Sequence, residues 1–348
     1  YQGNDQVWQG AVGADGTLYF GNRGQVLVFD GQTWDRVPVP GGAHVRALAM
    51  DARGTLWIGA VNELGRVETD PDGSRRFVSL RSAVPKEAGD LGTIWTVHAT
   101  PAGVWFQSNS AVLRWDGTKF DYWAPGERSI CLSFWMGDHL LVALMRGWFK
   151  PVADGKWEDL GRPEDKLGQY LPHFAIPHPK GGWLMGLEGA KGEVAGLARW
   201  DGHTLTLEPH PLDEWFRARR LYTGRRLADG RYVLTTLQGG AVVLGPDLSF
   251  ETWLNEKTGL ESDAVISATP DPSGAVWLGT EWGLSRLQLH PAFTWFGPAN
   301  GLGRRGVDAL VRWDGRLLVG DLHGLLTLKQ PDGLPGMPRF ERWSTLEE

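Results

Sequence analysis

The sequence predicts an all-β protein built from eight copies of one four-stranded antiparallel sheet. A turn glycine recurs before an alternating strand at near-regular intervals, and an Asp-Gly turn recurs later in most copies. No long stretch keeps the apolar rhythm of about 3.6 residues that is typical of a helix. A period of roughly 20 to 50 residues indicates a repeat architecture. We therefore expect each copy to form one sheet that packs against its neighbours.

The clearest copy lies between residues 264 and 296. Its four expected strands cover residues 264–268, 275–278, 284–289 and 293–296. Apolar and polar residues alternate in the third strand, and turns rich in glycine or proline separate the strands. Short strands joined by tight turns pair with their sequence neighbours, so this segment predicts one antiparallel sheet.

Two turn signals recur with the same phase along the chain. The glycine before the second strand is found at Gly16, Gly54, Gly103, Gly137, Gly182, Gly230, Gly274 and Gly315, at a mean interval of about 43 residues. Asp-Gly favours a two-residue hairpin because both residues tolerate positive φ. It begins at Asp30, Asp72, Asp116, Asp154, Asp201 and Asp332. Two independent signals therefore predict the same repeat.

The repeats can be placed in order along the chain. They are expected at residues 6–37, 44–80, 93–123, 128–160, 170–208, 217–254, 263–296 and 306–343. The first begins with its innermost strand and the last ends with its outermost strand, so no strand is expected to pass from one end to the other. A helical turn is expected only at residues 209–216, after the fifth repeat.

Four-stranded sheets of this period pack radially, because one sheet cannot bury both of its faces alone. We predict a β-propeller of four-stranded antiparallel blades that forms a single domain over residues 1–348. Eight blades are expected, and seven are the alternative if the fourth or fifth repeat is an elaboration. Closure of the ring is expected to depend on packing.

Composition and charge exclude several classes of protein. The net charge is −6 with acidic and basic residues interleaved, which disfavours nucleic acid and membrane surfaces as partners. The single cysteine, Cys131, excludes an intrachain disulfide and a thiolate zinc site. No apolar run is long enough to span a membrane. The chain begins at Tyr1 without Met, and we expect a fragment of a longer protein.

The segment from Asp271 to Arg286 resembles the repeat of two-component regulator propellers. It contains the pattern D-x-x-G-x-[LV]-W-[LI]-G-[TA] followed by Gly-Leu-x-Arg, and residues 51–59 match the first half. The resemblance implies the sensor part of a bacterial membrane-bound regulator, on the periplasmic or extracellular side. It also implies a glycan fragment or another small ligand, and a further β-domain, transmembrane helix and kinase or other output region in the same polypeptide. Such families usually have seven-bladed rings, often in pairs.

Candidate ligand-binding residues follow from position in a propeller. The start of the innermost strand and the loop between the second and third strands open on one face, around the central channel. The position eight residues before the turn glycine gives Trp8, Arg46 and Trp95. The inner loops give Arg23, Asn62, Glu63, Asn109, Arg146, Trp148, Glu188, Gln238, Glu281, Trp282, Asp321 and His323.

Aromatic rings beside charged groups suit a sugar or an anionic ligand, because rings stack on C–H faces and charged groups bind hydroxyls or carboxylates. Each residue also has a simpler interpretation, since blades use Trp for packing and rim charges are commonly solvated.

No set of residues predicts catalysis, a cofactor or a metal site. His173 and His178 are an odd number of residues apart on one strand and point to opposite faces. Glu188 and Glu193 lie in a glycine-rich loop without an apolar wall to raise a pKa. We therefore expect a non-catalytic domain that binds a carbohydrate or other small ligand at the channel face. A polysaccharide lyase or hydrolase and a protein-interaction scaffold are the alternatives, and whether the ring forms a homodimer stays open.

Overall fold

The computed structural model describes residues 6–126, 130–144, 147–161, 170–189, 194–289, 296–303, 306–321, 324–329 and 338–343. These residues form eight antiparallel sheets, seven with four strands and one with three. Within each sheet the strands lie in sequence order, so neighbouring strands are joined by hairpins. The predicted four-stranded antiparallel repeat and the count of eight sheets are confirmed.

The first four sheets cover the N-terminal half of the chain. The first contains β1 (Gly10–Val12), β2 (Leu18–Asn22), β3 (Gln25–Phe29) and β4 (Trp34–Pro38). The second contains β5 (Val45–Met50), β6 (Leu56–Ala60), β7 (Glu63–Thr69) and β8 (Arg75–Ser79). The third contains β9 (Ile94–Thr100), β10 (Gly103–Ser108), β11 (Val112–Trp115) and β12 (Phe120–Trp123). The fourth contains β13 (Ile130–Trp135), β14 (Leu140–Leu144), β15 (Gly147–Pro151) and β16 (Trp157–Asp159).

The other four sheets follow in the same order. The fifth contains β17 (Tyr170–Pro177), β18 (Trp183–Gly189), β19 (Val194–Trp200) and β20 (Leu205–Leu207). The sixth contains β21 (Leu221–Arg226), β22 (Tyr232–Thr236), β23 (Ala241–Leu244) and β24 (Phe250–Leu254). The seventh contains β25 (Val265–Pro270), β26 (Ala275–Thr280) and β27 (Leu284–Gln288). The eighth contains β28 (Ala309–Trp313), β29 (Arg316–Asp321), β30 (Gly324–Lys329) and β31 (Arg339–Arg342).

Helices are short, as the sequence predicts. The α-helix α1 (Asp213–Arg219) overlaps the second half of the expected helical turn at residues 209–216, and it buries Phe216. The other helical pieces of the described residues are 3-10 turns at η1 (Pro40–Gly42), η2 (Arg81–Ala83), η3 (Lys86–Ala88), η4 (Ala153–Gly155), η6 (Glu256–Thr258) and η7 (Pro298–Asn300). The fourth strand expected for the seventh repeat, at residues 293–296, lies outside the described residues except for Phe296.

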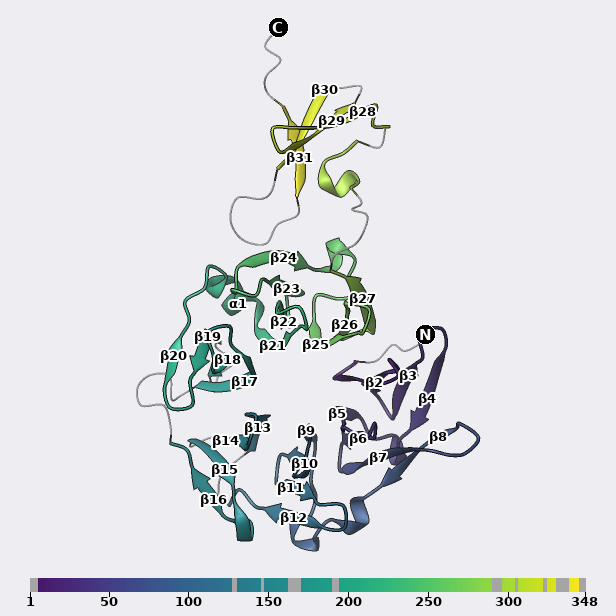
Figure 1. Ribbon diagram of the computed structural model, residues 1–348, viewed down its shortest axis with the longest axis vertical. Coiled ribbons are helices and arrows are strands. Elements are labelled where there is room, and N and C mark those ends of the chain that lie inside the picture. The colour runs from purple at the N-terminus through teal and green to yellow at the C-terminus, as the bar shows by residue number, and fades with distance from the viewer. Residues whose placement is uncertain are drawn as a thin grey trace.

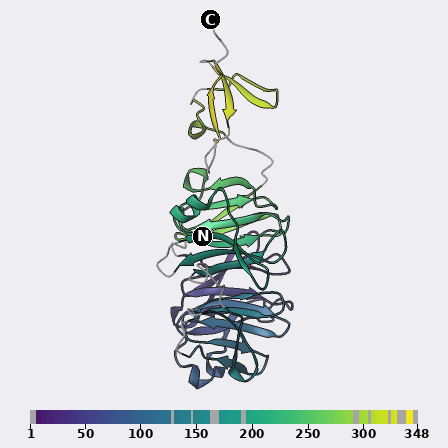
Figure 2. The same cartoon turned by 90° about the vertical axis from the view of Figure 1, so that its left-hand side faces the viewer.

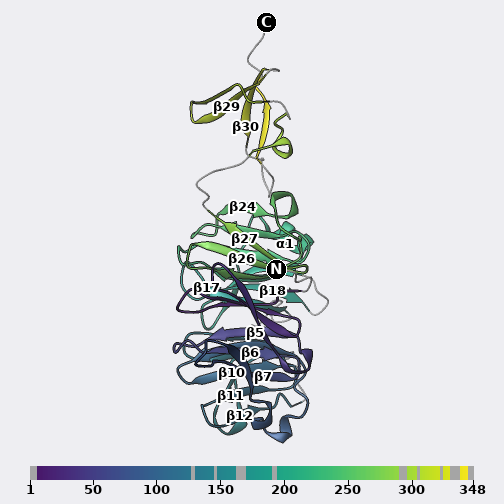
Figure 3. The same cartoon turned by 90° about the vertical axis from the view of Figure 1, so that its right-hand side faces the viewer.

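Seven sheets enclose a central channel, and the eighth stands apart from them (Figure 1). In each ring blade the first strand lies innermost and the last described strand lies outermost (Figure 1). Figures 2 and 3 show the ring edge-on, with the eighth sheet, in yellow, beyond its rim. The first seven sheets therefore form the closed ring, and the eighth lies outside it. The seven-bladed alternative treated the fourth or fifth repeat as an elaboration, but both of these repeats form regular four-stranded sheets.

The ring closes between the N-terminal segment and the seventh blade. The backbone N–H of Val7 donates to the carbonyl oxygen of Thr280 at 3.2 Å, and the Ser267 hydroxyl donates to the Val7 carbonyl at 3.1 Å. Trp277 packs against Phe20 of the first blade with ring centroids 5.4 Å apart. We expected packing alone at the closure. The structure corrects this expectation, because hydrogen bonds to the main chain of Val7 add to the packing.

The Asp of the repeat motif organises its own turn. Asp271 Oδ1 accepts the backbone N–H of Ser273 at 2.8 Å, and its Oδ2 accepts Trp277 Nε1–H at 3.0 Å and Arg286 Nε–H at 3.2 Å. Asp51 accepts Trp57 Nε1–H in the same way, at 2.9 Å. Burial acts to raise the pKa of Asp271, but the hydrogen bonds outweigh burial and lower it. The motif therefore has a structural role in these two blades.

The core lies between neighbouring blades. Ile58 of β6 and Phe106 of β10 are fully buried, and apolar residues of the second and third blades form one cluster. Trp148 is 2% exposed and meets the Trp200 ring edge-on at 4.9 Å between centroids. Each blade of the ring thus buries its faces against two neighbours, and the innermost strands of the ring line the channel.

Candidate functional site: the channel mouth

An irregularity recurs in the innermost strands at the mouth of the channel. In six of the seven ring blades the pairing between the first and second strands shifts by one residue. A β-bulge of this kind leaves one residue outside the ladder and re-aims its side chain. The residues passed over in five of these blades are Arg46, Trp95, His173, Tyr222 and Ile266.

All five bulged residues line one cavity of about 440 Å³ at the channel mouth. Trp8 joins them from the segment before β1, and Leu132 and Phe134 complete the wall from β13. Every blade of the ring therefore contributes to the lining. The volume lies in the range of small-molecule sites, which are typically about 300 to 1,000 Å³.

Arg46 lies between two tryptophan rings of this cavity. Its Cζ atom is 3.5 Å from the centroid of the Trp8 ring and 5.7 Å from that of Trp95. The Nε and Nη1 atoms of Arg46 are buried and have no hydrogen-bond partner. Burial also lowers the pKa of the guanidinium. Asn109 accepts a hydrogen bond from Trp95 Nε1–H and so holds this ring in place.

His173 Nε2 contacts a carboxylate oxygen of Glu188, and His173 lines the same cavity as Arg46. Arg220 Nη2 lies 3.6 Å from the other Glu188 oxygen. The hydrogen bond from His173 is the main reason why the pKa of Glu188 is lowered. The His173 ring centroid lies 5.9 Å from that of Tyr222, whose pKa is raised by burial. The carboxylate of Glu188 is therefore already contacted by two neighbouring side chains.

The channel continues past the mouth into a second cavity of about 510 Å³. Arg225 lines both cavities and donates from Nε to the Ala268 carbonyl at 3.4 Å. Its side chain is open to the channel, yet the surrounding walls desolvate it and lower its pKa. Desolvation also lowers the pKa of His98 to about 4, although a hydrogen bond with the Ser133 carbonyl opposes the shift.

The predicted site residues that the structure describes lie in different parts of the fold. Trp8, Arg46 and Trp95 line the mouth, and Asn109 and Glu188 contact residues that do. Trp148 lies in the core and Asp321 in the eighth sheet. Arg146 and His323 lie outside the described residues. The other predicted residues are outside the cavity lining, and they are Arg23, Asn62, Glu63, Gln238, Glu281 and Trp282.

Tyr222, Ile266, His173 and Arg225 line the channel but were not among the predicted residues. The signal for two of them was present, since Tyr222 and Ile266 lie eight residues before the turn glycines of their repeats, Gly230 and Gly274. His173 lies nine residues before Gly182, so the rule of eight residues before the turn glycine does not select it. Nothing in the pattern singles out Arg225.

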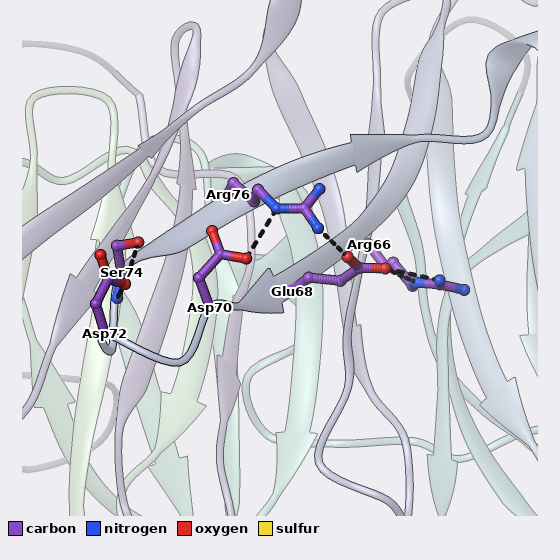
Figure 4. Close-up of polar contacts among 6 residues, drawn as sticks. All are labelled: Arg66, Glu68, Asp70, Asp72, Ser74 and Arg76. Carbon is purple, nitrogen blue, oxygen red and sulfur yellow. Dashed lines mark hydrogen bonds and ion pairs between the residues drawn. The ribbon is translucent and has the colours of Figure 1, made fainter.

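Charged residues elsewhere show how arginines are usually compensated in this chain. On β7 and β8, Arg66 Nη2 lies 2.7 Å from a Glu68 oxygen, and Arg76 contacts both Glu68 and Asp70 (Figure 4). This cluster is partly exposed, and such pairs contribute little to stability. Among the described residues, no ion pair joins Arg46 or Arg225 to a carboxylate.

Within the described ranges, three or more His, Cys, Asp or Glu side chains nowhere gather as a metal site would require. The described helices include none with the length and apolarity needed to cross a bilayer.

The chain resembles solved β-propellers in its fold. It matches the extracellular domain of the putative one component system BT4673 from B. thetaiotaomicron with a TM-score of 0.64 and 14% identity, over 99% of this chain and 47% of that one. The extracellular domain of the putative hybrid two component system BT3049 from the same organism matches with a TM-score of 0.67 and 15% identity, over 92% and 45%. The chain thus spans about half the length of these structures.

A virginiamycin B lyase from Staphylococcus aureus is also similar, with a TM-score of 0.57 and 14% identity, over 81% of this chain and 94% of the lyase. No model of a protein family matches the chain, and no curated protein matches it. At these identities the likeness concerns the fold. It agrees with the resemblance to two-component regulator propellers that the motif indicates.

Proposed function

We propose that this chain is the ligand-sensing domain of a bacterial signal-transduction regulator and that it binds a carbohydrate or another small ligand at the channel mouth. We place it on the periplasmic or extracellular side of the membrane. The likeness of its fold to extracellular domains of putative one- and two-component systems supports both parts of this proposal. The resemblance of residues 271–286 to the repeat of two-component regulator propellers also supports the proposal.

The observation that carries the proposal is the ring of bulged residues around one cavity. Bulges recur where a strand must re-aim a side chain, and here they aim at a shared space. Trp8, Trp95 and Tyr222 supply aromatic surface, while Arg46 supplies polar contacts. An apolar wall with a few convergent polar groups is typical of a small-molecule site.

The test is a panel of neutral and acidic oligosaccharides, with thermal melting and calorimetry as binding readouts and product analysis as the readout of turnover. Sensing predicts saturable stabilisation, because a ligand that binds only the folded state raises the melting temperature. The ligand should be recovered intact. New reducing ends or unsaturated sugar products would instead show that the protein is an enzyme, and they would overturn the proposal.

One observation favours a polysaccharide lyase as the second candidate. The His173 ring is held by Glu188 and lies beside Tyr222, and an oriented imidazole near a phenol is a suitable acid–base pair. The fold is also shared with a lyase. The product analysis above distinguishes a lyase from a non-catalytic sensor. If the protein is a lyase, His173→Gln should abolish turnover.

The exposed apolar surface of the eighth sheet supports the presence of a partner domain within the same polypeptide. Every residue of β28 is exposed, and Leu310 and Trp313 are 67% and 57% exposed. Exposed apolar surface of this kind marks an interaction site. We propose that a further β-domain packs on this strand and connects the ring to a membrane-anchored output region. In the longer polypeptide, hydrogen exchange of β28 should then be slower than in this chain.

A further inference from the structure

The channel of this acidic protein has a basic wall. The chain has a net charge of −6, yet the described residues that line the two cavities include no Asp or Glu. The same lining contains two arginines, Arg46 and Arg225. The low-dielectric walls strengthen the field of these groups inside the channel. An anion therefore finds a favourable potential there, despite the opposite charge of the whole molecule.

Arg46 is the group that most requires a counter-charge. Burying a cation without a partner is costly, and two of the three nitrogen atoms of this guanidinium are buried and lack acceptors. Stacking on Trp8 compensates part of this cost, because a cation is attracted to the face of an aromatic ring. The nearby carboxylate of Glu188 is engaged by His173 and Arg220. No described residue thus supplies the missing acceptor.

We propose that the channel mouth binds an acidic saccharide whose carboxylate contacts Arg46. The proposal rests on the ligand-binding function proposed above and names the class of ligand. A planar guanidinium matches the geometry of a carboxylate, which distinguishes it from a lysine at the same place. Trp8, Trp95 and Tyr222 provide the rings on which the C–H faces of a sugar stack. A cavity of about 440 Å³ holds more than an isolated anion.

Calorimetry of the intact chain with trigalacturonate tests the proposal, with a carboxyl-reduced trigalacturonate as the matched neutral probe. Loss of a hydrogen bond to a charged group should weaken affinity by about tenfold to a hundredfold. We expect this loss for the reduced sugar and for Arg46→Gln. A glucuronate disaccharide and a sulfated, carboxylate-free disaccharide serve as further probes. Raising the salt concentration should weaken binding of the acidic probes and leave neutral probes unaffected.

Two further variants distinguish a specific loss of ligand affinity from a loss caused by unfolding. Arg46→Lys keeps the charge but lacks the planar fork, so it should bind acidic probes more weakly than the wild type and more tightly than Arg46→Gln. Arg66→Gln is the control, because Arg66 is paired with Glu68 and lies outside the cavity lining. It should leave affinity unchanged. All variants are compared by thermal melting without ligand.

The outcomes separate this inference from the function on which it rests. If neutral oligosaccharides bind as tightly as the acidic probes, and Arg46→Gln leaves the affinity for both unchanged, ligand sensing stands and the acidic class is wrong. Binding of the sulfated probe without binding of either carboxylate also overturns the assignment. If no probe binds the wild-type chain, both proposals fail.

Discussion

In five of the ring blades, one bulged residue of the innermost strand contributes to the chemistry of the channel mouth. The bulge positions hold an arginine, a tryptophan, a histidine, a tyrosine and an isoleucine in the second, third, fifth, sixth and seventh blades, respectively. Because the backbone geometry is shared, the ligand can be changed by substitutions at these positions without altering the blades. Arg46 is the position where such a change should matter most, since its charge has no partner.

His98 should make stability depend on pH. Its pKa is about 4 in the folded chain and 6.5 without perturbation, so between these values the unfolded chain binds more protons. Stability should therefore fall as the pH is lowered from 6.5 to about 4. His98→Gln should remove this part of the dependence in thermal melting from pH 7 to pH 4. His203→Gln, at an exposed turn, is the control, and an equal slope in the wild type and His98→Gln would contradict the expectation.

At the scale of elements, the close contact between the N-terminal segment and β26 decides where the ring closes. A Cβ atom at Gly279 would overlap the carbonyl oxygen of Val7 and the hydroxyl of Ser267. The absence of a side chain at Gly279 is what allows Val7 to hydrogen-bond to the seventh blade. This explains physically why the Trp-Leu-Gly-Thr segment of the motif needs its glycine here.

Gly279→Ala should open this closure. Overpacking typically costs about 1 to 3 kcal/mol, and the backbone carbonyl of Val7 cannot move without breaking its own hydrogen bonds. We expect a lower melting temperature and faster hydrogen exchange in residues 6–12. Gly297→Ala is the matched control, because no atom lies near its Cβ position. Equal effects of the two substitutions would show that the seam tolerates a methyl group.

At the scale of the whole molecule, the ring and the eighth sheet are separate in space (Figure 1). Their interiors are also separate, since Leu278 is fully buried in the cluster between the sixth and seventh blades, whereas Leu318 is buried within the eighth sheet. Stability within one part should therefore respond weakly to a cavity in the other, as distant sites are usually independent.

Leu278→Ala and Leu318→Ala test this independence. A Leu→Ala change in a core typically costs about 2 to 5 kcal/mol. Leu278→Ala should accelerate hydrogen exchange in the ring and leave β29 and β30 unchanged. Leu318→Ala should do the reverse and should preserve ligand affinity at the channel mouth. Faster exchange throughout the chain in both variants would mean that the parts unfold as one unit.

Much of the fold and part of the site could be predicted from local sequence. Turn glycines, Asp-Gly pairs and alternating strands act between neighbours in the chain, so they predicted the sheets, their order and the helical turn near α1. The count of eight residues before Gly16, Gly54 and Gly103 found three residues of the cavity for the same reason. It missed His173, because the innermost strand of that blade is one residue out of step with the others.

The sequence by itself therefore determined the repeat, its strands and three of the residues at the channel mouth, since these depend on short-range turn and pairing preferences. Only the tertiary structure decided that seven sheets close and the eighth stands outside, because closure depends on the contact of Val7 with Thr280 and Ser267, more than 250 residues away. It also decided that Arg46 has no carboxylate partner among the described residues, whereas Glu188 is contacted by His173 and Arg220. Which charges meet across blades follows from packing, and no local pattern encodes it.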